Sequence, residues 1–316
     1  MSKRLAGFFA GTGGVELGFE QAGFETVFAN EWDKFAGVTY KANHVGSFVL
    51  GDVNDIEAGS LPEFDVLTGG FPCQAFSIAG YRKGFQDEKG RGNLFFKLAE
   101  FIDERKPEVV FLENVKILVT HYKGNTFKVI LDTLSKLGYH VKWQVLNAKD
   151  YGNVPQGRER IYIVGFKDED SCNRFVFPEP VKLTVKVKDC VDFVNKVDAK
   201  YYYSKDKYGY MYPMLDEVDT EGVVYQWRRK YVRANKSGVC PTLTANMGTG
   251  GHNVPLVKTK HGVRKLTPRE CFNLMGFPKS FKLPEGLSDA QLYKQAGNAV
   301  VPPVIKRIAE QISKAL

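Results

Sequence analysis

The feature that most constrains the fold is a regular alternation of short apolar runs and helix-period stretches between residues 5 and 164. Strand, helix, strand in this rhythm is typical of the α/β class, with a doubly wound, mostly parallel sheet and right-handed crossovers. In such a sheet, ligands bind beyond the carboxyl ends of the strands. We expect strands at Leu5–Phe9, Thr26–Ala29, Val49–Leu50, Phe64–Leu67, Val109–Leu112, Val141–Leu146 and Ile161–Gly165, and helices around 14–23, 34–43, 92–105 and 124–138.

The pattern changes after Pro178-Glu-Pro180, where the chain becomes basic, rich in tyrosine and irregular up to about residue 260. Helical patterns return at 269–275 and at 304–312. We therefore expect a first domain over residues 1–178, a smaller, loop-rich domain over 179–285, and a C-terminal segment over 286–316.

The composition favours a polyanionic partner and a reducing compartment. The net charge is +8, and the five cysteines contain no C-x-x-C pair, which argues against a disulfide framework and against a zinc cluster. No apolar run reaches the length of a membrane span, and the N-terminus lacks the apolar core of a signal sequence. We expect a cytoplasmic protein with no bound metal and no membrane contact.

Cys73 lies where an apolar strand gives way to a polar loop, in Leu67-Thr-Gly-Gly-Phe-Pro-Cys-Gln-Ala-Phe-Ser77. A thiol at the carboxyl end of a strand is well placed for a reactive role, although a free cysteine is more often a small buried hydrophobe. The stretch from Ala75 to Asn93 has the glycine content and polarity of a mobile lid.

The first expected strand runs into Phe9-Ala-Gly11-Thr-Gly13-Gly14, a turn whose glycines allow a ligand to approach the backbone. Glu31 follows the second strand, where an acidic residue can meet ribose hydroxyls, and Trp32 could stack on a purine. Asp52 follows the third strand and could accept from an exocyclic amine. The spacing is not G-x-G-x-x-G, so a nucleoside without a pyrophosphate fits better than a dinucleotide, and a nicotinamide oxidoreductase is disfavoured.

Three charged residues at other strand ends could face the same crevice. Glu113 follows Val109–Leu112, and its alternative is a helix cap or a solvated acid. Arg158 and Arg160 are two residues apart before the last strand, so in an extended segment they point the same way. Taken alone, these two arginines are more simply read as solvated surface groups.

Together these residues resemble the C5-cytosine DNA methyltransferases of bacterial restriction-modification systems. The motifs occur in family order over nearly the whole chain: Phe9-Ala-Gly-Thr-Gly-Gly14, Glu31-Trp-Asp33, Gly51-Asp52, Gly70-Phe-Pro-Cys-Gln74, Glu113-Asn-Val115, Gln156-Gly-Arg-Glu-Arg160, Arg264-Lys-Leu-Thr-Pro-Arg-Glu-Cys271 with Met275-Gly-Phe-Pro278, and Gln295-Ala-Gly-Asn-Ala-Val-Val-Pro302.

The resemblance implies a Rossmann-like methyltransferase fold and S-adenosyl-L-methionine as cofactor, with S-adenosyl-L-homocysteine as product. It implies that the final segment folds back onto the first domain. Cys73 would be the thiolate that attacks C6 of a flipped cytosine, Glu113 would bind N3 and N4, and Arg160 with Arg158 would hold O2. The implied cofactor-binding residues are Phe9, Gly11, Gly13, Gly14, Glu31, Trp32, Asp52, Val53, Pro72, Asn298 and Val300.

The basic second domain would then read double-stranded DNA, since arginine binds guanine and glycine-rich loops permit close approach to a groove. The candidate DNA-binding residues are Ser77, Lys83, Arg91, Arg228, Arg229, Arg233, Thr242, Gly250 and Gly251. We expect a monomer, with a cognate restriction endonuclease that acts on the same site without a required complex. The alternatives are a tRNA cytosine-5 methyltransferase of the same fold and a catalytically silent DNA-binding regulator.

Overall fold

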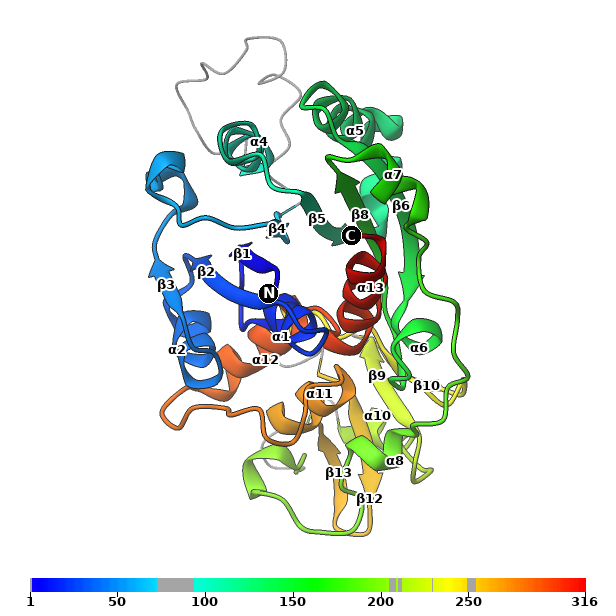
Figure 1. Ribbon diagram of the computed structural model, residues 1–316. Coiled ribbons are helices and arrows are strands. Elements are labelled where there is room, and N and C mark those ends of the chain that lie inside the picture. The colour runs from blue at the N-terminus through cyan, green and yellow to red at the C-terminus, as the bar shows by residue number, and fades with distance from the viewer. Residues whose placement is uncertain (1, 73–93, 205–208, 210–211, 229, 249–253) are drawn as a thin grey trace. The chain divides into compact units, whose positions relative to one another are not determined.

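The structure is a computed structural model that describes residues 2–72, 94–204, 209, 212–228, 230–248 and 254–316. These residues form two compact units (Figure 1). Unit 1 comprises Met1–Leu146, Glu159–Glu179 and Ile305–Leu316, and unit 2 comprises Asn147–Arg158 and Pro180–Val304. The change at Glu179/Pro180 lies one residue from the expected boundary. In contrast, residues 147–158 join unit 2, and the C-terminal return begins at Ile305, not at residue 286.

The sheet of unit 1 has seven strands in the order β3-β2-β1-β4-β5-β8-β6. Neighbours from β3 through β5 are parallel, whereas β8 is antiparallel to β5. The mostly parallel α/β class expected from the sequence is therefore confirmed. The strands are β1 (Arg4–Phe8), β2 (Glu25–Glu31), β3 (Ser47–Leu50), β4 (Val66–Gly69), β5 (Val109–Val115), β6 (His140–Asn147) and β8 (Glu159–Phe166).

Helices cover both faces of this sheet. On one face α4 and α5 bury Phe95, Leu98 and Ile130 in a core shared with alternate residues of β1, β4, β5 and β8. On the other face α1 contacts β5 through an edge-to-face pair of Phe19 and Phe111. The helical elements are α1 (Gly14–Glu20), α2 (Lys34–Asn43), α4 (Leu94–Arg105), α5 (Asn125–Lys136), α7 (Glu169–Arg174) and α13 (Pro302–Ala315), with 3₁₀ turns at Val53–Asp55, Ala58–Ser60 and Lys116–Gly124.

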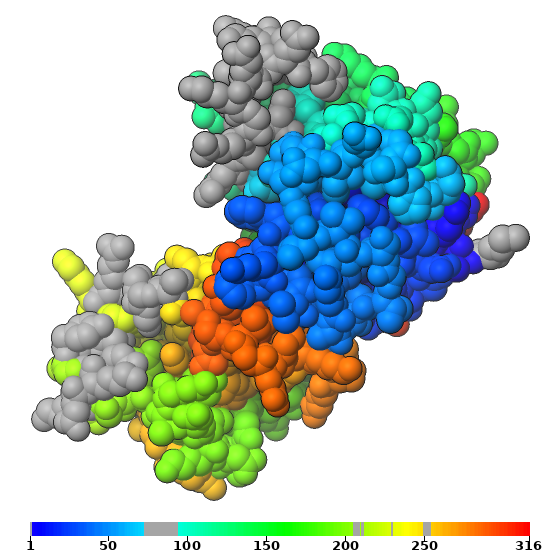
Figure 2. Space-filling model, turned by 90° about the vertical axis from the view of Figure 1, so that its left-hand side faces the viewer, coloured from blue at the N-terminus to red at the C-terminus, as the bar shows by residue number. Residues whose placement is uncertain are grey.

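Local sequence explains where these elements begin and which side they bury. Asp33 caps α2, because its Oδ1 accepts from the backbone N–H of Phe35 at 2.9 Å. In α4, buried residues recur with helical spacing, so one stripe of the helix packs on the sheet. α2 and β3 lie on the face of unit 1 that Figure 2 turns toward the viewer.

The strand order reverses at β1, because β2 lies on one side of β1 and β4 on the other. In open α/β sheets the crevice at such a point is where ligands bind. The loops that follow β1, β2, β4 and β5 all leave from the carboxyl edge of parallel strands. This topology brings the turn after Phe8, the acid Glu31 and the acid Glu113 to the same edge.

Unit 2 is built around a four-stranded sheet of order β10-β9-β12-β13. One face of the β9–β10 hairpin packs Tyr225, Trp227 and Val232 into a small apolar core. The elements of this unit are α6 (Ala148–Tyr151), β7 (Gln156–Gly157), α8 (Val187–Cys190), a 3₁₀ turn (Ala199–Tyr201), α10 (Tyr212–Leu215), β9 (Val224–Arg228), β10 (Tyr231–Asn235), β11 (Cys240–Pro241), β12 (Leu256–Thr259), β13 (Gly262–Lys265), α11 (Pro268–Leu274) and α12 (Asp289–Asn298).

A buried ion pair joins three segments of unit 2. Arg264 in β13 donates to both carboxyl oxygens of Glu270 in α11, at 2.8 and 2.7 Å, and to the carbonyl of Asp192 at 2.6 Å. Glu270 also completes a capping box with Thr267 at the start of α11. The side chains of Arg264 and Glu270 are 0% and 6% exposed, so each charge depends on the other.

Candidate functional site

The turn after β1 is shaped to receive a ligand against its backbone. Phe9 and Gly11 have φ of 57° and 58°, and Gly13, which precedes α1, has φ of 85°. A Cβ placed on Gly11 would meet nothing within 4 Å, whereas one on Gly13 would lie 2.0 Å from His44 Nε2. The turn is therefore open at Gly11 and backed by a side chain at Gly13, with Gly14 buried at the start of the helix.

Glu31 ends β2 and holds the turn by its carboxylate. Oε2 accepts from the N–H of Gly11 at 2.8 Å, and Oε1 accepts from the N–H groups of Trp32 and Asp33 at 3.0 and 2.8 Å. Burial raises the pKa of Glu31, although these three N–H groups oppose the effect. A carboxylate offers about four acceptor positions, so after these three bonds one remains for a hydroxyl donor.

Trp32 and Asp52 border the same strand edge. The indole of Trp32 is 75% exposed, which leaves an aromatic face open for stacking. Asp52 accepts from the N–H and the side-chain amide of Asn54, both at 2.9 Å and both through Oδ1. Pro72 is exposed, whereas the side chain of Val53 is 3% exposed and packs in the core of unit 1. The acceptors and the aromatic face fit a nucleoside with free ribose hydroxyls.

An ion pair lies where β5 and β8 run antiparallel. Arg160 Nε is 3.2 Å from Glu113 Oε1, and the two side chains are 15% and 12% exposed. Arg160 also donates from Nη1 to the carbonyl of Glu159 at 2.8 Å. A Cβ on Gly70 would lie 3.8 Å from Glu113 Oε2, so the carboxyl stands beside the chain as it leaves β4. The sequence predicts that Glu113 and Arg160 face one crevice, and the structure brings the two side chains together.

Asn114 was not among the predicted site residues, yet it holds the start of the loop after β4. Its Nδ2 donates to the carbonyl of Phe71 at 2.8 Å, and the side chain is buried. The sequence carries a signal for this residue, because an amide that closely follows the apolar run Val109–Leu112 is expected to be buried and then needs a backbone partner.

Arg158 lies in unit 2 and not with Glu113 and Arg160 in unit 1. Arg158 is 2% exposed. Nη1 donates to the carbonyl of Leu243 at 2.9 Å, and Nη2 donates to the carbonyls of Gly297 and Ala299 at 3.0 and 2.7 Å. These bonds tie three backbone segments of unit 2 to one guanidinium. The solvated-surface interpretation of this arginine is therefore wrong.

The exposed face of the β9–β10 hairpin groups two of the predicted DNA-binding arginines. Gln226 Oε1 accepts from Nη2 of Arg228 at 3.0 Å and from Nη2 of Arg233 at 2.6 Å. Gln226 lies opposite Arg233 across the hairpin. Trp227, which stands between Gln226 and Arg228 in β9, points to the other face and into the core. Both arginines are exposed and are held side by side by one neutral acceptor.

The remaining predicted residues divide between described and undescribed positions. Thr242 donates from Oγ1 to the carbonyl of Gly157 at 2.5 Å. Asn298 is exposed at the end of α12 and Val300 is buried beyond it, both in unit 2, and their role stays a prediction. The positions that lie outside the described residues are Cys73, Ser77, Lys83, Arg91, Arg229, Gly250 and Gly251.

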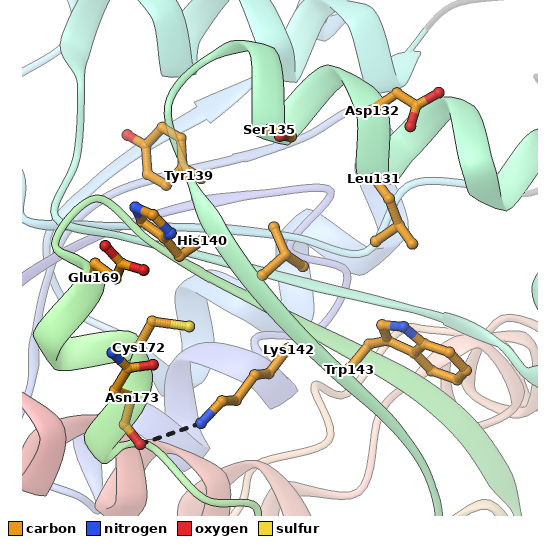
Figure 3. Close-up of a pocket in the computed structure, with 11 residues that line it drawn as sticks. Leu131, Asp132, Ser135, Tyr139, His140, Lys142, Trp143, Glu169, Cys172 and Asn173 are labelled. Carbon is orange, nitrogen blue, oxygen red and sulfur yellow. Dashed lines mark hydrogen bonds between the residues drawn. The ribbon is translucent and has the colours of Figure 1, made fainter.

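A groove of about 480 Å³ in unit 1 is lined by other residues (Figure 3). Lys142 crosses it and donates from Nζ to the carbonyls of Asn173 and Phe175, at 3.3 and 2.6 Å. None of the predicted site residues lines this groove, and we assign it no role. Its lining residues are Leu131, Asp132, Ser135, Tyr139, His140, Val141, Lys142, Trp143, Glu169, Cys172 and Asn173.

The described part of the chain contains neither a membrane-spanning helix nor a metal-binding cluster. No helix there is long and apolar enough to cross a bilayer. In the same residues, no three histidine, cysteine or acidic side chains gather in an arrangement that could hold a metal ion.

Comparison with known proteins identifies similar chains over almost the full length. The model of the family described as C-5 cytosine-specific DNA methylase matches residues 4–314. The Type II methyltransferase M.Bsp6I of Bacillus sp. (strain RFL6) is 58% identical over 314 residues, which is 99% of each chain. The Type II methyltransferase M.HhaI of Haemophilus parahaemolyticus is 40% identical over 99% of this chain and 95% of that one.

Solved structures with low sequence identity share the fold. A DNMT2 mutant of Spodoptera frugiperda superposes with a TM-score of 0.74 at 19% identity, over 99% of this chain and 100% of that one. A putative DNA modification methyltransferase encoded within a prophage of E. coli gives a TM-score of 0.70 at 20% identity, over 99% of each chain. The arrangement of elements is thus preserved where most side chains differ.

Proposed function

The chain belongs to the C-5 cytosine-specific DNA methylase family, and from this premise we propose how its residues methylate C5 of a cytosine in double-stranded DNA. The protein is a DNA (cytosine-5-)-methyltransferase, and enzymes of this family use S-adenosyl-L-methionine as methyl donor. The main support for the residue roles is the ion pair of Glu113 and Arg160, which lies beside Gly70, directly after the end of β4.

Cys73 is the proposed nucleophile. C5 of cytosine is too weak a nucleophile to take a methyl group directly, so the thiolate first adds to C6 and forms a C–S bond. The ring is then an enamine, and C5 attacks the methyl group. A base removes the C5 proton, the C–S bond breaks, and the thiolate leaves with its electron pair. C6 is inaccessible in a stacked duplex, so the base must be flipped out, at a cost of a few kcal/mol.

Glu113 and Arg160 are proposed to hold the flipped base. Glu113 would bind N3 and N4, and Arg160 would donate to O2, so that charge on the ring is balanced as sulfur adds to C6. Their positions on adjacent antiparallel strands fix the spacing of the two groups. Arg158, whose donors bind three backbone carbonyls, is better suited to position Leu243, Gly297 and Ala299 than to touch the base.

The turn after β1 is the proposed cofactor site. Glu31 would accept from a ribose hydroxyl, Trp32 would stack on the adenine, and Asp52 would accept from its amine. Gly11, Gly13 and Gly14 let the backbone approach the ligand, while Phe9, Val53, Pro72, Asn298 and Val300 complete the proposed set. When bound, the cofactor supplies a methyl group on a positively charged sulfur.

The exposed face of the β9–β10 hairpin is proposed to read the target sequence. Gln226 keeps the guanidinium groups of Arg228 and Arg233 side by side with donors free to face outward, the geometry in which arginine binds O6 and N7 of guanine. Replacing Arg233 by methionine should relax specificity at one base pair by roughly 1–3 kcal/mol. Loss of affinity by the same factor for every sequence would instead assign Arg233 to a phosphate.

The similarity to two Type II methyltransferases supports a role in a restriction-modification system. We propose that the enzyme protects a short specific site from a cognate endonuclease and acts as a monomer without a stable complex with it. The test is expression of the chain in a host that lacks cytosine methylation, followed by bisulfite sequencing. Methylation at one recurring short sequence supports the proposal, and methylation without sequence preference contradicts it.

The Cys73→Ser variant tests the nucleophile, with Cys172→Ala as the matched control because Cys172 is a buried thiol on α7. The first should abolish transfer of labelled methyl groups to duplex DNA, and the second should retain it. Transfer to tRNA but not to plasmid DNA would favour the tRNA enzyme. Specific binding of duplex DNA with no methylated product would favour the silent regulator.

A further inference from the structure

A cluster of titratable side chains lies directly beneath the proposed cofactor turn. Glu16 in α1 is 1% exposed, and the side chain of His44, at the end of α2, is also 1% exposed. Glu20, one helical turn after Glu16, joins them from α1. The mechanism above uses none of the three, yet buried ionisable groups are costly and require a reason.

Two of these side chains lie directly against the backbone of β1 and of the turn that follows it. Glu16 Oε1 occupies the space next to Gly7 in β1, where a Cβ would come within 2.0 Å of it. His44 Nε2 occupies the equivalent space next to Gly13 in the turn, also at 2.0 Å. The strand that leads into the turn and the turn itself are thus supported by a carboxyl and an imidazole. A change of charge in this cluster therefore acts next to the backbone of the proposed cofactor turn.

The two carboxyls of the cluster differ in their partners. Burial raises the pKa of Glu20, but contacts with His44 Nδ1 at 3.4 Å and Thr26 Oγ1 at 2.7 Å outweigh it and leave the pKa lowered. Glu16 Oε2 has no hydrogen-bond partner among the described residues. Burial raises the pKa of Glu16 to about 7, with the charge of His44 opposing and those of Glu20 and Glu31 adding to the rise.

The groups that face Glu16 come from each element packed around it. His44 and Tyr40 come from α2, where the two rings stack at 4.5 Å, and burial raises the pKa of Tyr40 so that its phenol stays neutral. Glu31 comes from β2 and Glu20 from α1 itself. α13 packs on α1 through the apolar Ile305. With Glu16 ionised, the cluster holds two carboxylates and one imidazole, and Glu31 adds a third carboxylate at the turn, so the local charge is negative.

We propose that Glu16, backed by His44, is a positioning residue whose ionisation makes the turn prefer the cationic methyl donor over its neutral demethylated product. The inference rests on the proposed cofactor site. Methyl transfer removes the positive charge from sulfur, so S-adenosyl-L-homocysteine gains nothing from a nearby buried carboxylate, whereas S-adenosyl-L-methionine does. Such a preference lets the product leave after each transfer.

The direction of the pH effect follows from linkage. A cation bound at the turn lowers the pKa of Glu16, so donor binding releases protons near neutral pH, and product binding does not. The ratio of the product Kd to the donor Kd should rise roughly 3- to 10-fold from pH 5.5 to pH 7.5. This rise corresponds to a lowering of the pKa of Glu16 by about half to one unit when the donor binds.

The experiment is isothermal titration calorimetry of the free protein with each ligand across this pH range. Wild type should show the rise in the ratio of the two Kd values, and Glu16→Gln, which mimics the protonated carboxyl, should show a flat ratio. Glu25→Gln, an exposed glutamate of β2, is the matched control and should behave as wild type. His44→Gln removes the opposing positive charge, so the rise should move to higher pH.

Wild-type protein alone also gives an answer if Glu16→Gln fails to fold. Titrations at pH 7 in two buffers of different ionisation enthalpy should reveal more protons released by the donor than by the product. Equal proton release, or a ratio in Glu16→Gln that rises as in wild type, overturns the inference while leaving the cofactor site intact. Failure of both ligands to bind wild type overturns the cofactor site and this inference with it.

Discussion

Replacing Arg264 by methionine should destabilise unit 2 strongly and weaken sequence-specific DNA binding. The guanidinium donates to both oxygens of Glu270 and to the carbonyl of Asp192, in a site where the two charged side chains are 0% and 6% exposed. Breaking a buried pair by removing one partner costs about 3–5 kcal/mol, because the other charge stays buried. In the variant, Glu270 would still accept hydrogen bonds from the backbone N–H groups of Asp192 and Thr267, at 2.9 and 2.8 Å. We therefore expect a loss at the lower end of this range, about 3 kcal/mol.

The assay is urea unfolding followed by fluorescence of Trp227, which lies in the core of unit 2, in a background where Trp32 and Trp143 are phenylalanine. Binding of S-adenosyl-L-homocysteine and of target DNA is measured in parallel on chains with Trp32 intact. We expect affinity for target DNA to fall more than affinity for S-adenosyl-L-homocysteine, since the proposed cofactor turn belongs to unit 1 and only Asn298 and Val300 of the proposed cofactor set lie in unit 2.

Two further variants define the result that would refute this reasoning. The double variant Arg264→Met with Glu270→Leu removes both charges and should recover most of the loss, because apolar replacement of a buried pair is often neutral. Lys306→Met removes an exposed pair with Glu310, 42% and 44% exposed, and should cost less than about 1 kcal/mol. An Arg264→Met loss as small as that of Lys306→Met would show that burial does not set the energy of the pair.

Three other predictions follow from described contacts. Burial raises the pKa of Cys190 to about 11 and also raises the pKa values of Cys172, Cys240 and Cys271. At pH 8 these four thiols should therefore react slowly with a disulfide reagent. A fast-reacting thiol in wild type that is lost in Cys73→Ser would identify Cys73. Gly11→Ala should weaken cofactor binding and cost about 1–2 kcal/mol in stability measured by urea unfolding, because φ is 58° but the added methyl meets nothing within 4 Å. As pH rises from 4.5 to about 7, wild type should lose stability that Glu16→Gln does not lose. The reason is that the raised pKa of Glu16 lets the folded state bind more protons than the unfolded state in this range. Equal slopes of unfolding free energy against pH in the two proteins would contradict this.

The sheet of unit 1 was readable from the sequence because its strands are short apolar runs separated by helix-period stretches. Leu5–Phe9, Val109–Leu112 and Ile161–Gly165 each overlap an observed strand. The strand Phe64–Leu67 is shifted by two residues, since the chain bends at Asp65 and β4 runs to Gly69. Periodicity could not show that β8 is antiparallel to β5, because a strand buried on both faces reads alike in either direction.

The candidate site was predictable where a polar residue follows an apolar strand, as at Glu31 and Glu113. The contacts of Arg158 were not, because its carbonyl partners lie at residues 243, 297 and 299, and a sequence pattern gives no information on such distant pairs. Glu16 escaped notice for a different reason. At the third position of a short helix it reads as a solvated acid, and its burial depends on packing against Gly7.

The assembly of unit 1 from three stretches of chain has a consequence for its synthesis. α1 packs on α13 so closely that a Cβ on Gly18 would lie 2.5 Å from that of Ile305. A ribosome makes all of residues 180–304 between Glu179 and this helix, a wait on the order of ten seconds at about 5–20 residues per second. During that time the nascent chain exposes the apolar side of α1 that Ile305 later covers. The turn that follows β1 therefore lacks the packing of α1 on α13 until the whole of unit 2 has been translated, so an interrupted polypeptide lacks part of the support of the proposed methyl-donor site.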